Sequence, residues 1–110
     1  MKRGEIWLVN FDPAVGTEYK KARPALIVQS DIVSSSLVTI IPLSSQIQNR
    51  YEDDILVLKN LDNRLFSDSL IKVTQISSFD RVRFVNYIGI LQDEIIEKVN
   101  TYLKKHFNLG

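Results

Sequence analysis

The chain has 110 residues, of which 45% are hydrophobic, and its formal net charge is +1 at pH 7. This length suits a single domain spanning residues 1–110, and so small a net charge excludes a protein that binds polyanions through its overall charge. The absence of cysteine excludes disulfides, thiolate catalysis and cysteine-based zinc sites. With no secretory signal at the amino terminus and no run of about 18 apolar residues, a cytoplasmic location is expected.

The first two predicted strands flank a polar, basic loop. Residues 5–11 and 24–29 are rich in β-branched and other apolar side chains and are bounded by turn residues, which is the pattern of buried strands. Pro24 favours an extended backbone at Arg23, at the entrance to the second strand. The loop is therefore expected to have fixed ends and to hold Arg23 in place.

The rest of the chain predicts more short strands and then one helix. Strands are expected over residues 37–43, 54–58, 69–75 and 85–89. Residues 61–64 and 77–80 carry Asx and Ser turn chemistry, and the second segment is interpreted as the start of one short helical turn. From Gln92 the apolar period becomes helical, with one stripe made of Ile95, Ile96, Val99, Tyr102, Leu103 and Phe107. This order predicts a mainly β fold with helical cover, as a small curled antiparallel sheet or barrel.

Several kinds of catalytic chemistry find no support in the sequence. His106 stands alone, near the end of the predicted helix, so a two-histidine ribonuclease mechanism is excluded. The acidic run at residues 52–54 places neighbouring side chains on opposite faces of a strand, which suits a solvated edge better than a metal site. Neither a glycine-rich phosphate loop nor a nucleophile elbow occurs. No metal and no other cofactor are expected.

The polar loop does carry the groups that bind anions. The guanidinium of Arg23 matches phosphate oxygens, Lys20 and Lys21 add positive charge, and Tyr19 offers a stacking surface. An anionic ligand such as a nucleic acid is the functional interpretation. The alternative is a solvated loop whose charges only confer solubility.

A family resemblance decides between these interpretations. The chain closely resembles the MazF/PemK (Kid) toxins of bacterial toxin-antitoxin systems, and the resemblance covers nearly its whole length. No single motif is decisive, but their order and spacing are specific. The segments that carry it are Arg3-Gly4-Glu5-Ile6-Trp7-Leu8-Val9, Asp12-Pro13, Gly16-Thr17-Glu18, Arg23-Pro24, Pro42-Leu43-Ser44-Ser45, Val73-Thr74-Gln75-Ile76 and Ile88-Gly89-Ile90-Leu91.

The resemblance implies an SH3-like barrel with a carboxy-terminal helix and a sequence-specific, metal-independent endoribonuclease that cuts single-stranded RNA. In this reaction the 2′-hydroxyl attacks the adjacent phosphate, leaving a 2′,3′-cyclic phosphate and a 5′-hydroxyl. By resemblance, Arg23 is the principal catalytic residue and also assists proton transfer to the leaving 5′-oxygen, and Ser44 stands at the position of a catalytic Thr or Ser. Glu18 matches a loop acid implicated in some family members, and a carboxylate near the 2′-hydroxyl could serve as general base. From the residues alone, Ser44 could instead satisfy backbone groups at a strand end, and Glu18 could simply pair with Lys20 or Lys21.

RNA recognition is expected to involve unstacked bases, whose faces and edges are open to loop side chains. Ser77 replaces the basic residue that commonly follows the Gln-Ile pair of the family, so Arg81 or Arg83 supplies that charge or the target sequence differs. The alternative is that this turn only caps a strand. The expected RNA-binding residues are Thr17, Tyr19, Lys20, Lys21, Ser45, Gln46, Gln75, Ser77 and Arg81.

The resemblance also implies a homodimer and a cognate antitoxin that blocks the RNA groove. A basic loop offers an acidic peptide an electrostatic reason to compete with RNA. Two other functions stay open, because one fold hosts several activities: a gyrase-poisoning toxin of the same fold, or a module that binds RNA or a peptide without cutting.

Overall fold

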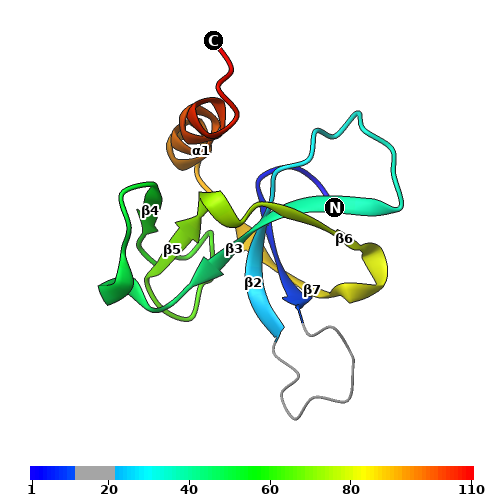
Figure 1. The fold of residues 1–110 in the computed structure, drawn as a ribbon. Helices are drawn as coiled ribbons and strands as arrows, with labels where there is room; N and C mark the ends of the chain where they lie inside the picture. The colour runs from blue at the N-terminus through cyan, green and yellow to red at the C-terminus, as the bar shows by residue number, and fades with distance from the viewer. Residues whose placement is uncertain (12–21) are drawn as a thin grey trace.

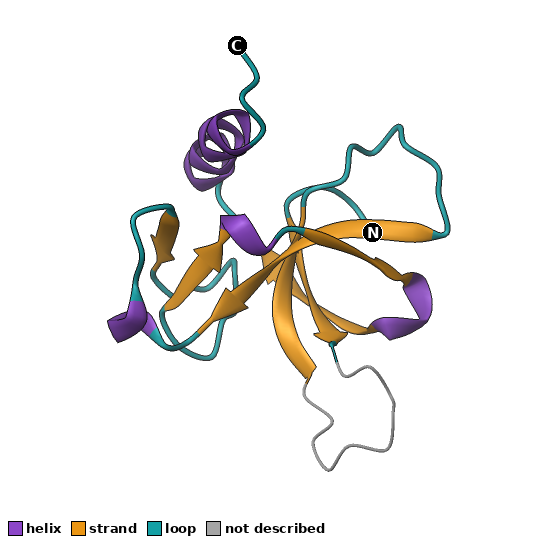
Figure 2. Cartoon of the chain, in the orientation of Figure 1, coloured by secondary structure: helices purple, strands orange, loops and turns teal. Residues whose placement is uncertain are grey.

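The computed structural model describes residues 1–11 and 22–110. The strands of the described residues are β1 (Glu5–Asn10), β2 (Ala22–Ile27), β3 (Leu37–Ser44), β4 (Asp54–Val57), β5 (Ser69–Lys72), β6 (Ser77–Asp80) and β7 (Phe84–Ile90). They pair in the order β4-β5-β3-β2-β1-β7, with β6 paired to β3 beside this path, and every pairing is antiparallel. Over these residues β4 and β7 do not pair, so the curved sheet of Figures 1 and 2 is barrel-like without being closed.

Strand β3 has partners along both edges and holds the sheet together. One edge pairs with β2, while the other pairs first with β6, as far as Ile40, and then with β5, from Leu43 onward. Pro42 lies in the gap between these two partners. A proline lacks an amide hydrogen and is tolerated where a strand edge has no partner. The change of partner makes β3 common to both parts of the sheet.

Two clusters of buried apolar side chains form the core. The first includes Ile41, Ile71 and the helical residue Val99, and the second includes Val9 and Ile40. Ile40 and Ile41 are adjacent in β3 yet belong to different clusters, because successive side chains of a strand project to opposite faces.

The predicted helix is confirmed as α1 (Asp93–His106). Its acidic residues lie in the first turn and its basic residues in the last, which matches the helix dipole. Val99 is fully buried, and Ile95, Ile96, Tyr102 and Leu103 pack against the first cluster. Figure 1 shows α1 at the end of the sheet that carries β4 and β5. The expected class, a small antiparallel β fold with a carboxy-terminal helix, is confirmed.

The structure corrects the sequence prediction around residues 73–80. Strand β5 ends at Lys72, and residues Val73–Gln75 form a short 3-10 helix where a strand was expected. Residues Ser77–Asp80, expected to be a turn, form β6 instead. Pairing with β3 overrides the turn preference of the serines, and the hydroxyls of Thr39 and Ser78 share a hydrogen bond of 2.7 Å across this pair. The short helical turn follows at Arg81–Arg83, where the Asp80 side chain accepts from the Val82 N–H.

Over the described part of the chain, no helix has the length and apolar character needed to cross a membrane.

Candidate active site

The start of β2 and the end of β3 lie side by side. Ala25 pairs with Pro42, which fixes the antiparallel register of the two strands. Arg23 and Ser44 each lie two residues beyond this last pair, on neighbouring strands. Both line the same cavity, so the fold brings together the two residues for which the sequence analysis predicted catalytic roles.

A cavity of about 450 Å³ opens over this corner of the sheet. It is lined by residues 22–24, 43–46, 65–67 and Ser69. The lining thus includes Arg23 and Ser44 together with Ser45 and Gln46, which were predicted to bind RNA. Arg23, Ser45 and Gln46 are exposed and Ser44 is half-buried, so a ligand in the cavity can reach all four.

The hydroxyl of Ser44 takes part in the turn that follows β3. Its Oγ accepts a hydrogen bond of 3.1 Å from the Gln46 N–H. The turn is tightened by a second bond of 2.9 Å, from the Ile47 N–H to the Ser45 carbonyl. A hydroxyl has one hydrogen and two lone pairs, so accepting this bond leaves the Ser44 hydrogen able to point at a ligand oxygen. Ser44 therefore has the backbone role that the sequence analysis gave as its alternative, and this role is compatible with a catalytic one.

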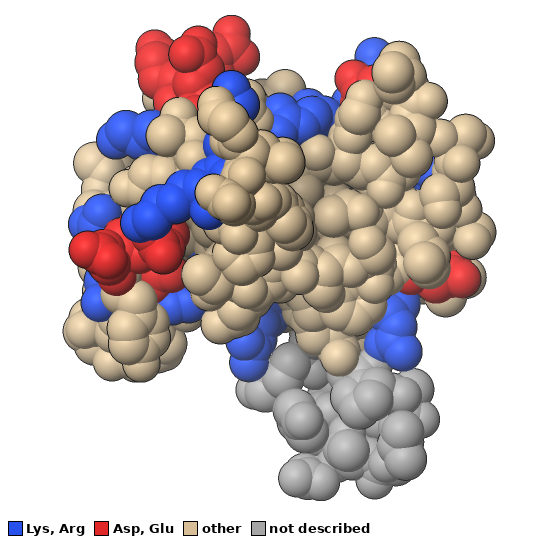
Figure 3. All heavy atoms as spheres, turned by 45° about the horizontal axis from the view of Figure 1, so that its top comes forward, with Lys and Arg blue, Asp and Glu red and all other residues tan. Residues whose placement is uncertain are grey.

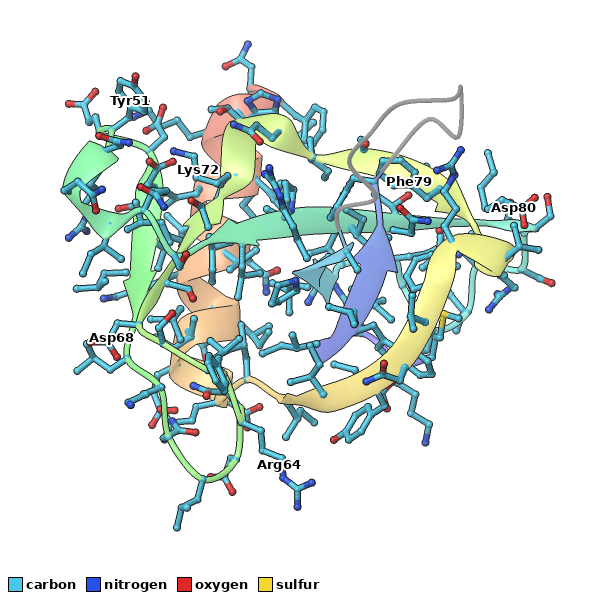
Figure 4. The ribbon with its side chains drawn as sticks, turned by 90° about the horizontal axis from the view of Figure 1, so that it is seen from below. Tyr51, Arg64, Asp68, Lys72, Phe79 and Asp80 are labelled. Atoms are coloured by element: carbon cyan, nitrogen blue, oxygen red, sulfur yellow. The ribbon has the colours of Figure 1, made fainter. Side chains whose placement is uncertain are left out.

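Besides the walls formed by β2 and by the end of β3, the cavity has a third wall that was not predicted from the sequence. It comes from the loop between β4 and β5, which contributes Leu65, Phe66 and Ser67. Leu65 is buried in the first core cluster, whereas Phe66 is 99% exposed. Figure 4 shows Arg64 and Asp68 on this loop at the edge of the molecule. In the sequence, this segment shows only an apolar pair, Leu65 and Phe66, between turn-forming residues. This pattern does not reveal that the pairing of β5 with β3 brings the loop to the end of β3.

The other predicted site residues lie either away from this cavity or outside the described residues. Gln75 and Ser77 are exposed but do not line this cavity. Arg81 donates a hydrogen bond of 3.3 Å to the Ser35 carbonyl and lines a small cavity beside Ile27, at the opposite end of β2 from Arg23. The predicted base Glu18 and the predicted RNA contacts Thr17, Tyr19, Lys20 and Lys21 lie outside the described residues.

A buried ion pair fixes the segment that leads from the cavity to β4. The Lys72 ammonium lies 2.6 Å from Asp54 Oδ2, and the side chains are only 11% and 3% exposed. The same carboxylate oxygen accepts a bond of 2.9 Å from the Tyr51 N–H, and the Lys72 nitrogen lies 4.9 Å from the centre of the Tyr51 ring. Figure 4 shows Tyr51 and Lys72 close together. The pair thus ties the chain that follows Gln46 to the sheet.

Positive and negative side chains are both numerous, with 14 Lys and Arg residues against 13 Asp and Glu residues. Figure 3 shows Lys and Arg side chains in several separate groups on the face that it draws, with Asp and Glu side chains beside some of them. The pKa values of two groups away from the cavity are shifted. Burial acts to raise the pKa of Glu5, but hydrogen bonds from the Trp7 ring N–H and the Lys2 N–H outweigh it and lower the pKa. The pKa of the exposed Lys105 is raised by its hydrogen bond to Asp53.

A second cavity, of about 670 Å³, lies between β4, the β4–β5 loop and α1. Its basic lining residues are Arg50, Lys59 and Lys98. It shares no lining residue with the first cavity. Over the described parts of the chain, no three His, Asp or Glu side chains are arranged to hold a metal ion.

Comparison with known proteins assigns the chain to a family. A sequence model described as "PemK-like, MazF-like toxin of type II toxin-antitoxin system" matches residues 2–107. The protein named Endoribonuclease MazF9 from Mycobacterium tuberculosis is 31% identical over 116 residues, covering 99% of this chain and 98% of that protein. The protein named Endoribonuclease EndoA from Bacillus subtilis is 29% identical over 106 residues, covering 94% of this chain and 91% of that protein.

Solved structures share the fold at lower sequence identity. A MazE-MazF crystal structure from Deinococcus radiodurans superimposes with a TM-score of 0.80 at 18% identity, covering 100% of this chain and 98% of that chain. A mycobacterial endoribonuclease in complex with its cognate antitoxin gives a TM-score of 0.77 at 19% identity, covering 100% of this chain and 97% of that chain. From the match over residues 2–107 and the relative at 31% identity, the chain belongs to the family of PemK-like, MazF-like toxins of type II toxin-antitoxin systems.

Proposed function

We propose that this chain is a sequence-specific endoribonuclease toxin that cleaves single-stranded RNA. The observation that carries the proposal is the cavity that Arg23 and Ser44 share, where the neighbouring strands β2 and β3 meet. Membership of the toxin family and the endoribonuclease names of its relatives support the same activity.

The chemistry proposed for the cavity begins with the RNA itself. The 2′-oxygen attacks the adjacent phosphorus and the bond from phosphorus to the 5′-oxygen breaks, which yields a 2′,3′-cyclic phosphate and a 5′-hydroxyl. The 2′-hydroxyl proton passes to a base, for which Glu18 is the proposed residue, and the departing 5′-oxygen takes up a proton from solvent in a transfer that Arg23 assists. Because the RNA supplies the nucleophile and Arg23 supplies positive charge, we propose that no metal ion is required.

Arg23 and Ser44 have distinct proposed roles. The guanidinium offers several N–H donors to the phosphate oxygens and stabilises the negative charge that grows as the 2′-oxygen attacks. The same positive charge stabilises the departing 5′-oxygen while it is protonated. Ser44 donates its hydroxyl hydrogen to the same phosphate. Ser45 and Gln46, in the adjoining turn, are proposed to contact a base, and Gln75, Ser77 and Arg81 are kept as proposed RNA contacts outside the cavity.

The test is cleavage of a long, unstructured RNA by the purified protein and by Arg23→Ala. Loss of one preorganised donor typically lowers a rate about 10²- to 10³-fold, and we expect a loss of this size. Arg50→Ala is the matched control, because Arg50 is an exposed arginine that lines the other cavity, and it should cleave at the wild-type rate. Equal activity of wild type and Arg23→Ala would refute the assignment.

We further propose that the chain forms a homodimer and is inhibited by a cognate antitoxin. The antitoxin part is supported by solved structures of this fold that are described as a complex with a cognate antitoxin or as MazE-MazF, and the homodimer part by the family resemblance. An acidic protein encoded beside this chain should suppress RNA cleavage, and light scattering should give twice the mass of one chain. An active enzyme that such a partner leaves unaffected would contradict the antitoxin proposal. A monomeric mass at micromolar concentration would contradict the homodimer.

A further inference from the structure

Phe66 presents an exposed aromatic ring inside the candidate active site. It lines the same cavity as Arg23 and Ser44, and its side chain is 99% exposed. Burial of a phenyl ring stabilises a folded protein, and at Phe66 this contribution is not realised within the chain. The ring is therefore available to a ligand of the cavity.

The loop that carries Phe66 is held by hydrogen bonds at its start. Asn63 is only 1% exposed, and its side-chain oxygen accepts bonds of 3.0 Å each from the N–H groups of Asn60 and Leu65. Its side-chain nitrogen donates a bond of 2.9 Å to the Leu58 carbonyl. Because Leu65 is also buried in the core, the residue that directly precedes Phe66 has a fixed position.

The far side of Phe66 is fixed as well. The Ser69 hydroxyl donates a bond of 2.9 Å to the Ser67 carbonyl, and the Asp68 carboxylate accepts a bond of 2.9 Å from the Lys59 N–H. The phenyl ring is thus presented to solvent by anchored residues on both sides. An aromatic ring held in this way loses little entropy when it binds a flat partner.

Exposure alone does not distinguish Phe66. Leu61, in the same loop, is 94% exposed but does not line the cavity. Single exposed apolar residues are normal on protein surfaces and need no explanation. What sets Phe66 apart is its position beside a guanidinium and a hydroxyl that are both suited to a phosphate. In RNA, the groups within reach of a bound phosphate are the neighbouring bases, and single-stranded bases expose faces on which aromatic rings stack.

We propose that Phe66 is a substrate-binding residue whose ring stacks on the unpaired RNA base next to the phosphate that is cut. This inference rests on the proposed function and deepens it, because it assigns a base contact to a residue of the β4–β5 loop. Stacking involves the face of a base, which all four bases have, so Phe66 contributes affinity and leaves the recognised sequence unchanged.

The first test separates binding from chemistry in steady-state cleavage. Phe66→Ala should raise KM about 5- to 150-fold with kcat within about twofold of wild type, because the lost contact is made equally in the ground and transition states. Phe66→Trp should keep the wild-type KM, and Phe66→Leu, which is apolar but not aromatic, should behave like Phe66→Ala. Leu61→Ala, the matched control from the same loop, should have no effect. If wild type is active and Phe66→Ala has an unchanged KM, the inference about Phe66 is wrong and the proposed function still stands.

The second test reports contact directly. Trp7 is the one tryptophan of the chain, so Phe66→Trp adds a single new fluorophore at the cavity. An RNA with a 2′-deoxy nucleotide at the cleaved position cannot react, and its binding should quench Phe66→Trp fluorescence well beyond the change seen with wild type. Equal changes in both proteins would exclude stacking at residue 66. If wild type neither binds nor cuts RNA, the proposed function fails and the inference fails with it.

A contact with a second copy of the chain is the competing explanation for an exposed phenyl ring. Light scattering on wild type and Phe66→Ala decides between the two. The stacking role predicts equal masses for both proteins. A shift of Phe66→Ala toward the monomer would show that the ring belongs to an interface between copies and would overturn the proposal.

Discussion

At the scale of single residues, Ser44 combines a structural and a proposed catalytic role in one hydroxyl. Its oxygen holds the turn through the Gln46 N–H, and its hydrogen is proposed to bind the scissile phosphate. A hydroxyl can do both at once because it accepts and donates through different positions. Both Ser and Thr supply a hydroxyl that fits these two roles.

Ser44→Ala should lower the single-turnover rate of RNA cleavage about 10- to 150-fold, as expected for a lost hydrogen bond to a charged group of about 1.5–3 kcal/mol. Ser44→Thr should stay within a few-fold of wild type. Ser67→Ala is the matched control, because Ser67 also lines the cavity but is assigned no contact with the phosphate. Equal losses in Ser44→Ala and Ser67→Ala would show that Ser44 has no special role.

At the scale of elements, the position of the β4–β5 loop depends on β7. The Ile90 N–H of β7 donates a bond of 3.1 Å to the Asp62 carbonyl of the loop. Next to it, Gly89 lies so close to the loop that a Cβ atom there would stand 2.4 Å from the Asn63 carbonyl oxygen. The backbone of β7 is thus a support for one wall of the cavity.

Gly89→Ala should destabilise the protein by about 1–3 kcal/mol, because the added methyl group must push backbone atoms apart. Urea unfolding of wild type and Gly89→Ala measures the difference. Gly110→Ala serves as control, since a Cβ there meets nothing within 4 Å. A free energy of unfolding that is equal in Gly89→Ala and wild type would mean that the loop does not press against β7.

Most elements could be predicted from the sequence because each has a local cause. Short β-branched runs predicted β1 to β4 and β7, and an apolar stripe at helical spacing predicted α1. Strand β6 could not be predicted, because Ser77–Asp80 has the composition of a turn and becomes a strand only through its pairing with β3. The end of β5 at Lys72 was missed because the apolar run continues past it into the 3-10 helix.

At the scale of the whole molecule, the site depends on segments that are distant in sequence. The proposed roles of Arg23 and Ser44 come from the family resemblance, whereas their presence in one cavity comes from the pairing of β2 with β3. Phe66 could not be predicted, because an aromatic residue in a turn-rich loop has no pattern of its own. It reaches the cavity because β5 pairs with the end of β3 through Leu43↔Ile71. Local patterns therefore predicted most of the elements, and long-range pairing brings together the segments that line the cavity.

The most direct test of the central claim is chemical mapping of both RNA ends after cleavage by wild type and Arg23→Ala in excess EDTA. The account predicts sequence-restricted cuts by wild type that carry 2′,3′-cyclic phosphate and 5′-hydroxyl ends, and loss of these cuts in Arg23→Ala. Well-folded wild type that leaves varied RNAs intact would contradict it and direct attention to DNA supercoiling or to binding alone. Cuts that require a metal ion or carry 5′-phosphate ends would contradict the proposed chemistry.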